Sequence, residues 1–157
     1  MKSPNESDRH DVGGPDRETD QTAEPTQPDG RGDTVRRVVA AQQTAASLTE
    51  LWSPRVIAEL DDHYVKVAKV QGSLAWHSHA EEDELFYVLA GALRIEMEDG
   101  DVELREGDVY VVPRGVRHNP VADRECLLML VERASTLHTG DVITERTRSI
   151  EDQKRPL

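Results

Sequence analysis

The chain has 157 residues, of which 36% are hydrophobic and 4% aromatic, so it fits one domain with a modest core and excludes a multidomain assembly. Acidic residues outnumber basic ones by 31 to 19, and the formal net charge of -12 repels phosphate backbones and anionic lipid, which argues against nucleic-acid and membrane partners. A single cysteine excludes an intramolecular disulfide, and the lack of an apolar run of about 18 residues or a signal-peptide core predicts a soluble, cytoplasmic protein.

Residues 1–33 form the first distinct segment of the chain. They contain nine acidic and four basic residues, four prolines and four glycines, and their only large apolar side chains are Met1 and Val12. Such a segment cannot bury enough apolar surface to offset the entropy lost on ordering. We therefore expect a disordered acidic tail.

Residues 34–54 lead from this tail into the domain. The runs 35–41 and 44–52 fit a strand followed by a short helix, and they fit one irregular helix equally well. Either element should stop before Pro54, because the residue before a proline disfavours the helical conformation. The sequence leaves both alternatives open.

From residue 55 the pattern changes to short strands bounded by glycine, proline or acidic turns. Asp99-Gly100 is a tight-hairpin signal, because both residues tolerate positive φ. With no helical pattern between the strands, the region 55–138 should form an all-β sandwich or barrel. The expected strands are 56–60, 64–70, 85–90, 93–97, 102–104, 109–112, 116–121 and 127–131.

The last segment, residues 139–157, is polar and charged and has Val142, Ile143 and Ile150 as its few apolar anchors. We expect it to be an arm that lies on the surface of the domain or on a partner subunit.

Histidine and carboxylate side chains suggest a metal site. His77 and His79 are two residues apart, so on a strand both imidazoles point to the same face. Glu84 opens the strand that follows, and His118 comes after a Pro-Arg-Gly turn. Neutral imidazole and carboxylate suit divalent first-row ions, and four ligands leave coordination positions open for water or substrate.

A plainer interpretation stands beside this one. Two histidines spaced by one residue also occur as solvated side chains on an exposed strand, and His118 alone is a weaker signal. The other three histidines, at positions 10, 63 and 138, are expected to be solvated.

The whole arrangement resembles two motifs of the cupin superfamily. The first runs from Gly72 through the two histidines and Glu84 to Gly91, and the second comprises Gly107, Pro113, Gly115 and His118. The resemblance implies a double-stranded β-helix, or jelly roll, that is usually a homodimer. It also implies one divalent metal ion held by His77, His79, Glu84 and His118.

The sequence departs from the family pattern at two positions. Four residues rather than five separate Gly72 from His77, and Ala122 stands where an asparagine commonly closes the second motif. Neither departure removes a metal-binding group, but both argue against assigning a subfamily. Within the acidic run 81–84, spacing to Gly91 selects Glu84 over Asp83.

Strand alternation suggests which side chains surround the ion. If Glu84 faces the metal, Phe86 and Val88 share its face and either line a pocket or belong to the plain core. Trp76 points away from the metal. Arg94 fits a solvated sheet face, and if it instead points inward it could hold a carboxylate or phosphate of a substrate.

Two classes of function follow from these expectations. The first is a small metal-dependent enzyme that acts on a small polar metabolite, similar to cupin isomerases of sugar phosphates or to cupin dioxygenases. The second is a non-catalytic module that binds or senses a small ligand. The ligand types do not distinguish manganese, iron, cobalt, nickel, copper and zinc.

Overall fold

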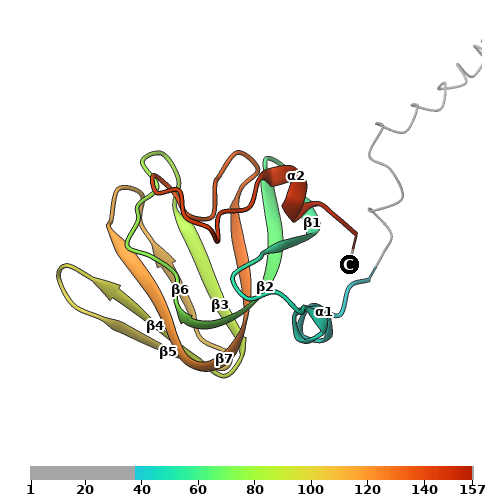
Figure 1. Ribbon diagram of the computed structural model, residues 1–157, viewed down its shortest axis with the longest axis horizontal. Coiled ribbons are helices and arrows are strands. Elements are labelled where there is room, and N and C mark those ends of the chain that lie inside the picture. The colour runs from blue at the N-terminus through green and yellow to red at the C-terminus, as the bar shows by residue number, and fades with distance from the viewer. Residues whose placement is uncertain (1–37, 157) are drawn as a thin grey trace, which may run out of the picture. The chain divides into compact units, whose positions relative to one another are not determined.

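The computed structural model describes residues 38–156, so the predicted tail 1–33 and the start of the lead-in segment lie outside the described residues. Within 38–156 there are seven strands and two short helices (Figure 1). The helices are α1 (Ala41–Ser47) and α2 (Ile150–Gln153). The strands are β1 (Arg55–Leu60), β2 (His63–Ser73), β3 (Glu84–Ala90), β4 (Ala92–Met97), β5 (Val102–Arg105), β6 (Val109–Val112) and β7 (His118–Arg133).

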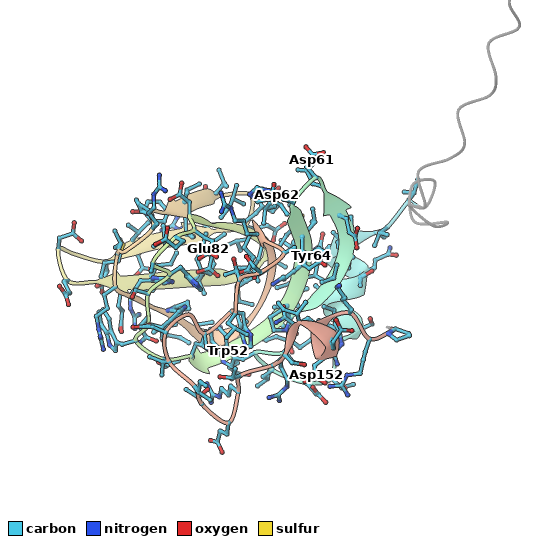
Figure 2. The ribbon with its side chains drawn as sticks, turned by 90° about the horizontal axis from the view of Figure 1, so that it is seen from above. Trp52, Asp61, Asp62, Tyr64, Glu82 and Asp152 are labelled. Atoms are coloured by element: carbon cyan, nitrogen blue, oxygen red, sulfur yellow. The ribbon has the colours of Figure 1, made fainter. Side chains whose placement is uncertain are left out.

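All strand pairs between named strands in this part of the chain are antiparallel, as expected of an all-β jelly roll. The hydrogen-bonded order is β1-β2-β7-β3-β6, and β4 joins both β5 and β7. The Asp61-Asp62 turn joins β1 to β2 (Figure 2), and the predicted turn at Gly100 joins β4 to β5, where the Gly100 N–H donates to the Met97 carbonyl.

The prediction of two strands at 116–121 and 127–131 is wrong, because β7 is continuous over 16 residues. Its first residues pair with β4, from His118 opposite Met97, and its later residues pair with β2 and β3. The polar residues between these two parts, 123–125, are exposed but stay extended. A charged interruption in a hydrophobic pattern therefore marks a strand that passes from one side of the barrel to the other, and not a turn.

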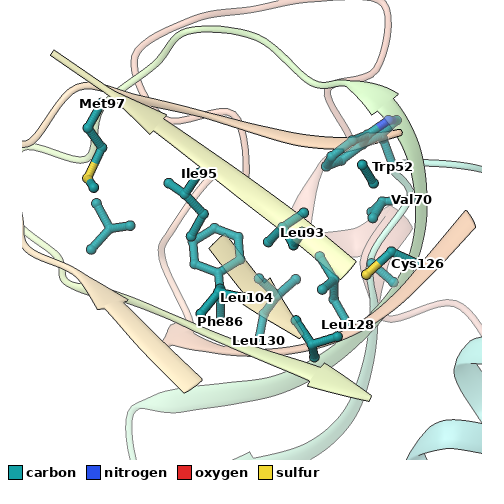
Figure 3. Packing of buried hydrophobic residues seen from close by; sticks show 14 residues of the cluster. Trp52, Val70, Phe86, Leu93, Ile95, Met97, Leu104, Cys126, Leu128 and Leu130 are labelled. Carbon is teal, nitrogen blue, oxygen red and sulfur yellow. The ribbon is translucent and has the colours of Figure 1, made fainter. Parts of the chain in front are cut away.

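The core lies between the two sides of the barrel, where alternate residues of each strand point inward (Figure 3). Cys126 is fully buried in this core, as predicted for a structural thiol, and burial raises the pKa of its thiol to about 11. The other labelled members of the cluster are Trp52, Val70, Phe86, Leu93, Ile95, Met97, Leu104, Leu128 and Leu130.

A short helix covers part of the outer face of the barrel. The helix α1 ends at Ser47, before the predicted end at Trp52, and its Ala45 packs on Val67 and Leu127. Trp52 instead takes a positive φ of 57° and turns its indole into the core, where Nε1 donates to the Gln71 carbonyl at 2.8 Å. Tertiary packing of the indole thus replaces the last helical turn expected from the sequence.

The C-terminal arm begins directly after β7, at residue 134 and not at the expected residue 139, and its described part, 134–156, folds back on its own barrel. Its red ribbon runs across one end of the strands to α2, which lies beside β1 (Figure 1). Ser149 and Asp152 form a capping box at the start of α2. Thr139 and Gln153 are fully buried, so part of this polar arm contributes to the interior.

Candidate metal centre

Four side chains converge at the end of the barrel under the C-terminal arm. Glu84 is the first residue of β3 and His118 is the first residue of β7, whereas His77 and His79 lie in the connection between β2 and β3. The two histidines therefore do not lie on a named strand, which was the condition under which their spacing placed both imidazoles on one face. A single bridge pairs His77 with His118, with both N–H···O distances at 2.9 Å, and it keeps the backbone extended so that both histidines still point inward.

The four side chains predicted as ligands lie close together. One ligand atom from each lies within 4.8 Å of all the others, and no residue of the set is more than 5% exposed. Glu84 Oε2 is 3.1 Å from His79 Nε2 and 3.2 Å from His118 Nε2. These residues are His77, His79, Glu84 and His118.

Backbone contacts determine which imidazole nitrogen is available for an ion. His77 Nδ1 lies 2.9 Å from the Ala75 carbonyl and His118 Nδ1 lies 3.0 Å from the Val116 carbonyl, so each Nδ1–H donates to its backbone partner. The Nε2 atoms then point into the cluster, and the buried Nε2 of His77 has no hydrogen-bond partner within the described residues. Imidazoles that bind metal commonly show this arrangement, in which the remote N–H is held by a carbonyl. The residues present therefore fit a divalent ion.

The electrostatics of the cluster favour an anionic carboxylate. Burial alone raises the pKa of Glu84, but the close imidazoles of His118 and His79 outweigh burial and lower it. Burial alone lowers the pKa of His79, but the Glu84 carboxylate outweighs this effect and raises it. Burial also lowers the pKa of His77 to about 4, which keeps this imidazole neutral and able to donate its lone pair.

The structure separates the two acidic candidates for the cluster. The Asp83 carboxylate points away from the three histidines and accepts a hydrogen bond from the Arg114 N–H at 2.9 Å. Glu84 faces inward and is 3% exposed. The choice of Glu84 by its spacing to Gly91 agrees with this geometry.

The inner face of β3 is occupied as strand alternation predicts. Phe86 and Val88 are buried on the same face as Glu84. The Phe86 ring meets the His118 ring edge to face, with 6.2 Å between centroids, and Phe86 also lines an apolar cavity of about 20 Å³ beside Glu84. Val88 does not line this cavity and packs in the core.

Residues expected outside the centre show a mixed outcome. Trp76 is 37% exposed and points away from the cluster, as predicted. Arg94 lies on the outer face of β4, where Nη2 donates to Glu96 at 3.3 Å, so the inward alternative for Arg94 is wrong. His63 is partly exposed in the turn region, and His10 lies outside the described residues.

The prediction that His138 is solvated is wrong. His138 is 4% exposed, its Nε2 pairs with the Arg146 carbonyl at 3.1 Å, and it lines the cavity beside Glu84. Burial lowers the pKa of His138 to about 4. Only the fold of the C-terminal arm brings this residue to the centre, so no local pattern in the sequence could have identified it.

The arm closes the centre through contacts to the residue between the two histidines. Asp141 Oδ1 accepts from the Ser78 N–H at 2.8 Å, and the Asp141 N–H donates to the Ser78 carbonyl at 3.1 Å. Gly140 lies so close that an added Cβ would stand 2.1 Å from the Ser78 carbonyl oxygen and 3.1 Å from the His77 ring. The arm is therefore part of the wall of the centre.

The chain is similar to known proteins in sequence and in fold. The family model described as "Cupin domain" matches residues 63–132. A cupin-2 domain containing protein from Shewanella frigidimarina is 42% identical, with a TM-score of 0.59, and the match covers 61% of this chain and 94% of that one.

Two curated relatives match shorter stretches. The uncharacterized protein YdbB of Bacillus subtilis is 40% identical over 63 residues, which are 40% of this chain and 56% of YdbB. The 3-hydroxyanthranilate 3,4-dioxygenase 2 of Aspergillus fumigatus is 27% identical over 89 residues, which are 53% of this chain and 46% of that enzyme. The chain thus spans about half the length of the curated relatives it matches.

None of the helices in residues 38–156 is long and apolar enough to cross a membrane.

Proposed function

The chain belongs to the cupin family, and from this premise we propose that it binds one divalent first-row metal ion and uses it in the chemistry of a small polar metabolite. The proposed ligands are His77, His79, Glu84 and His118. When bound, the ion would supply Lewis acidity or one-electron chemistry.

One observation carries this proposal. Two of the three histidines have their Nδ1–H groups held by backbone carbonyls, so their Nε2 lone pairs converge with a buried carboxylate in a space closed to bulk water. A cluster built only for structure would pair its polar atoms with one another, whereas the buried His77 Nε2 is left for a further partner.

Oxygen-dependent conversion of the small polar metabolite is the first of two candidate reaction classes. The imidazole and carboxylate ligand set suits iron, and the similarity to a dioxygenase of Aspergillus fumigatus supports the same class. Isomerisation of a sugar phosphate is the alternative within the enzyme class, since the same ligands accept manganese or zinc.

A non-catalytic binding module is the second candidate function. Its support is the closure of the centre, in which each of the four side chains is at most 5% exposed and the arm covers Ser78. A binding or sensing role tolerates slow entry of the ligand better than an enzyme does.

The first experiment is elemental analysis of untagged protein purified without added metal or chelator, with His77→Ala as the ligand variant and His63→Ala as the matched control. About one equivalent of metal in the wild type and in His63→Ala, lost in His77→Ala, supports the proposed centre. Iron would direct the next assays to oxygen uptake, and zinc or manganese to isomerisation. A wild-type protein that takes up no metal after reconstitution with each candidate ion refutes the proposal.

Two finer expectations accompany this proposal. We propose that the protein is a homodimer and that it acts in the cytoplasm. Light scattering of the full chain tests the first, and cell fractionation tests the second.

A further inference from the structure

A buried ion pair lies on the inner face of the barrel, outside the four proposed ligands. Lys66 on β2 and Glu132 on β7 are both 0% exposed, and Lys66 Nζ is 2.7 Å from Glu132 Oε1. The contact is an ion pair, and neither group has another polar side-chain or backbone partner within the described residues. Burying two charged groups that lack further hydrogen-bond partners costs folding free energy, so packing alone does not explain this pair.

The strand register brings this pair beside the proposed metal centre. β3 and β7 pair Leu85 with Val131, so Glu84 and Glu132 occupy the next position on each strand. Both are buried and both alternate onto the inner face, where cross-strand neighbours are in side-chain contact range. The Glu132 carboxylate also helps to raise the pKa of His79, which is consistent with this proximity.

The buried charges of this region can be counted. Glu84 and Glu132 carry one negative charge each, Lys66 carries one positive charge, and imidazoles that bind metal are neutral. A divalent ion then leaves the centre with one net positive charge. Without Lys66 the same centre would be neutral, and a neutral centre has no electrostatic preference for an anion.

We propose that Lys66 offsets the buried negative charge of Glu132, so that the metal centre keeps one net positive charge and takes a small monoanionic ligand, such as a carboxylate or an ionised hydroxyl group. This inference rests on the proposed function, because the count includes the divalent ion. Lys66 acts at a distance through its charge and is a specificity-determining residue that does not touch the ligand. Uncompensated charge in a buried site attracts a counter-ion far more strongly than the same charge at the surface does.

The test measures the affinity of the cobalt-loaded protein for azide. Binding is monitored through the change in the visible absorption of cobalt. The assay is run at pH 8, because burial, opposed by Lys66 and reinforced by Glu84, raises the pKa of Glu132 to about 7. Four proteins are compared: the wild type, Lys66→Met, Glu132→Gln and the double variant. Cobalt content is measured on each sample.

The charge count predicts an order of affinities. Glu132→Gln adds a net positive charge and should bind azide roughly tenfold more tightly than the wild type, and Lys66→Met should bind it roughly tenfold more weakly. The double variant restores the net charge and should bind within about threefold of the wild type. Should Lys66→Met not fold because it leaves Glu132 unpaired, the comparison of Glu132→Gln with the double variant still isolates the charge of Lys66.

The outcomes separate the inference from the proposed function. Full cobalt occupancy with the predicted order supports both. Full occupancy with the same azide affinity in every folded variant overturns the inference alone. A wild-type protein that takes up no cobalt overturns the proposed function, and the inference with it.

Discussion

The barrel strands and the C-terminal arm build the same centre by different means. The strands place Glu84 and His118 through repeated backbone pairing and an alternating pattern that recurs along each strand. The arm reaches the centre through single contacts, of which the pair between Asp141 and Ser78 is the best defined. The strands therefore provide two of the proposed ligands, the connection between β2 and β3 provides His77 and His79, and the arm decides how closed the centre is.

The largest expected effect is the loss of bound metal when a metal-ligating residue of the barrel is replaced. His118→Ala should reduce bound metal from about one equivalent to near zero, because His118 supplies one of only four ligand atoms. Elemental analysis checks this, with His63→Ala as the control. Full metal content in His118→Ala would remove His118 from the ligand set.

A substitution in the arm should destabilise the fold rather than remove a ligand. Gly140→Ala places a Cβ against the Ser78 carbonyl at a positive φ of 52°, and we expect a loss of ~3 kcal/mol in the free energy of unfolding by urea. Gly72→Ala is the matched control, since its φ of 75° is also positive but nothing lies within 4 Å of its added Cβ. Equal losses in the two variants would mean that the arm does not pack tightly on Ser78.

The arm should also make the metal-free protein sensitive to acid. Burial lowers the folded-state pKa of His138 to about 4, below its ordinary value of 6.5. As the pH falls, His138 is therefore protonated in the unfolded chain before it is protonated in the folded protein. Its contribution to the free energy of unfolding is present above about pH 6.5 and is lost as the pH falls toward 4.

At pH 5 this loss should be ~2 kcal/mol relative to pH 7.5, and His138→Gln should remove it. Urea unfolding at the two pH values measures the difference, with His63→Gln as the control. The same acid dependence in wild type and His138→Gln would show that other buried groups, such as His77, account for it.

The smallest effect is expected at the single contact between arm and centre. Asp141→Ala removes an acceptor of the Ser78 N–H and should cost ~1 kcal/mol in the free energy of unfolding. The same change should speed the transfer of metal to a chelator, because Ser78 lies between His77 and His79. Asp141→Asn keeps an acceptor oxygen and should restore slow transfer. Fast transfer in Asp141→Asn as well would assign the effect to charge and not to the hydrogen bond.

Local patterns in the sequence predict much of the barrel and the composition of the cluster. Alternation identifies the strands around Glu84 and Phe86, since successive residues of a strand point to opposite faces. The spacing of His77 and His79 predicts that they share a face, and that relation holds even where the structure has only a bridge in place of a strand. These features depend on neighbours along the chain and can be read from the sequence.

Other features depend on segments that are distant in the sequence. The continuity of β7 reflects its successive pairing with β4 and with β2 and β3, so the polar residues 123–125 look like a turn until those partners are known. The Lys66–Glu132 pair looks like ordinary charged positions of two amphipathic strands, and only barrel closure turns both side chains inward. His138 looks like a solvated histidine until the arm folds back over Ser78. The sequence by itself determined the strands and the chemical type of the cluster, because those follow from local periodicity. Tertiary structure alone decided the closure of the centre and the charges buried beside it, because burial depends on which distant segments pack together.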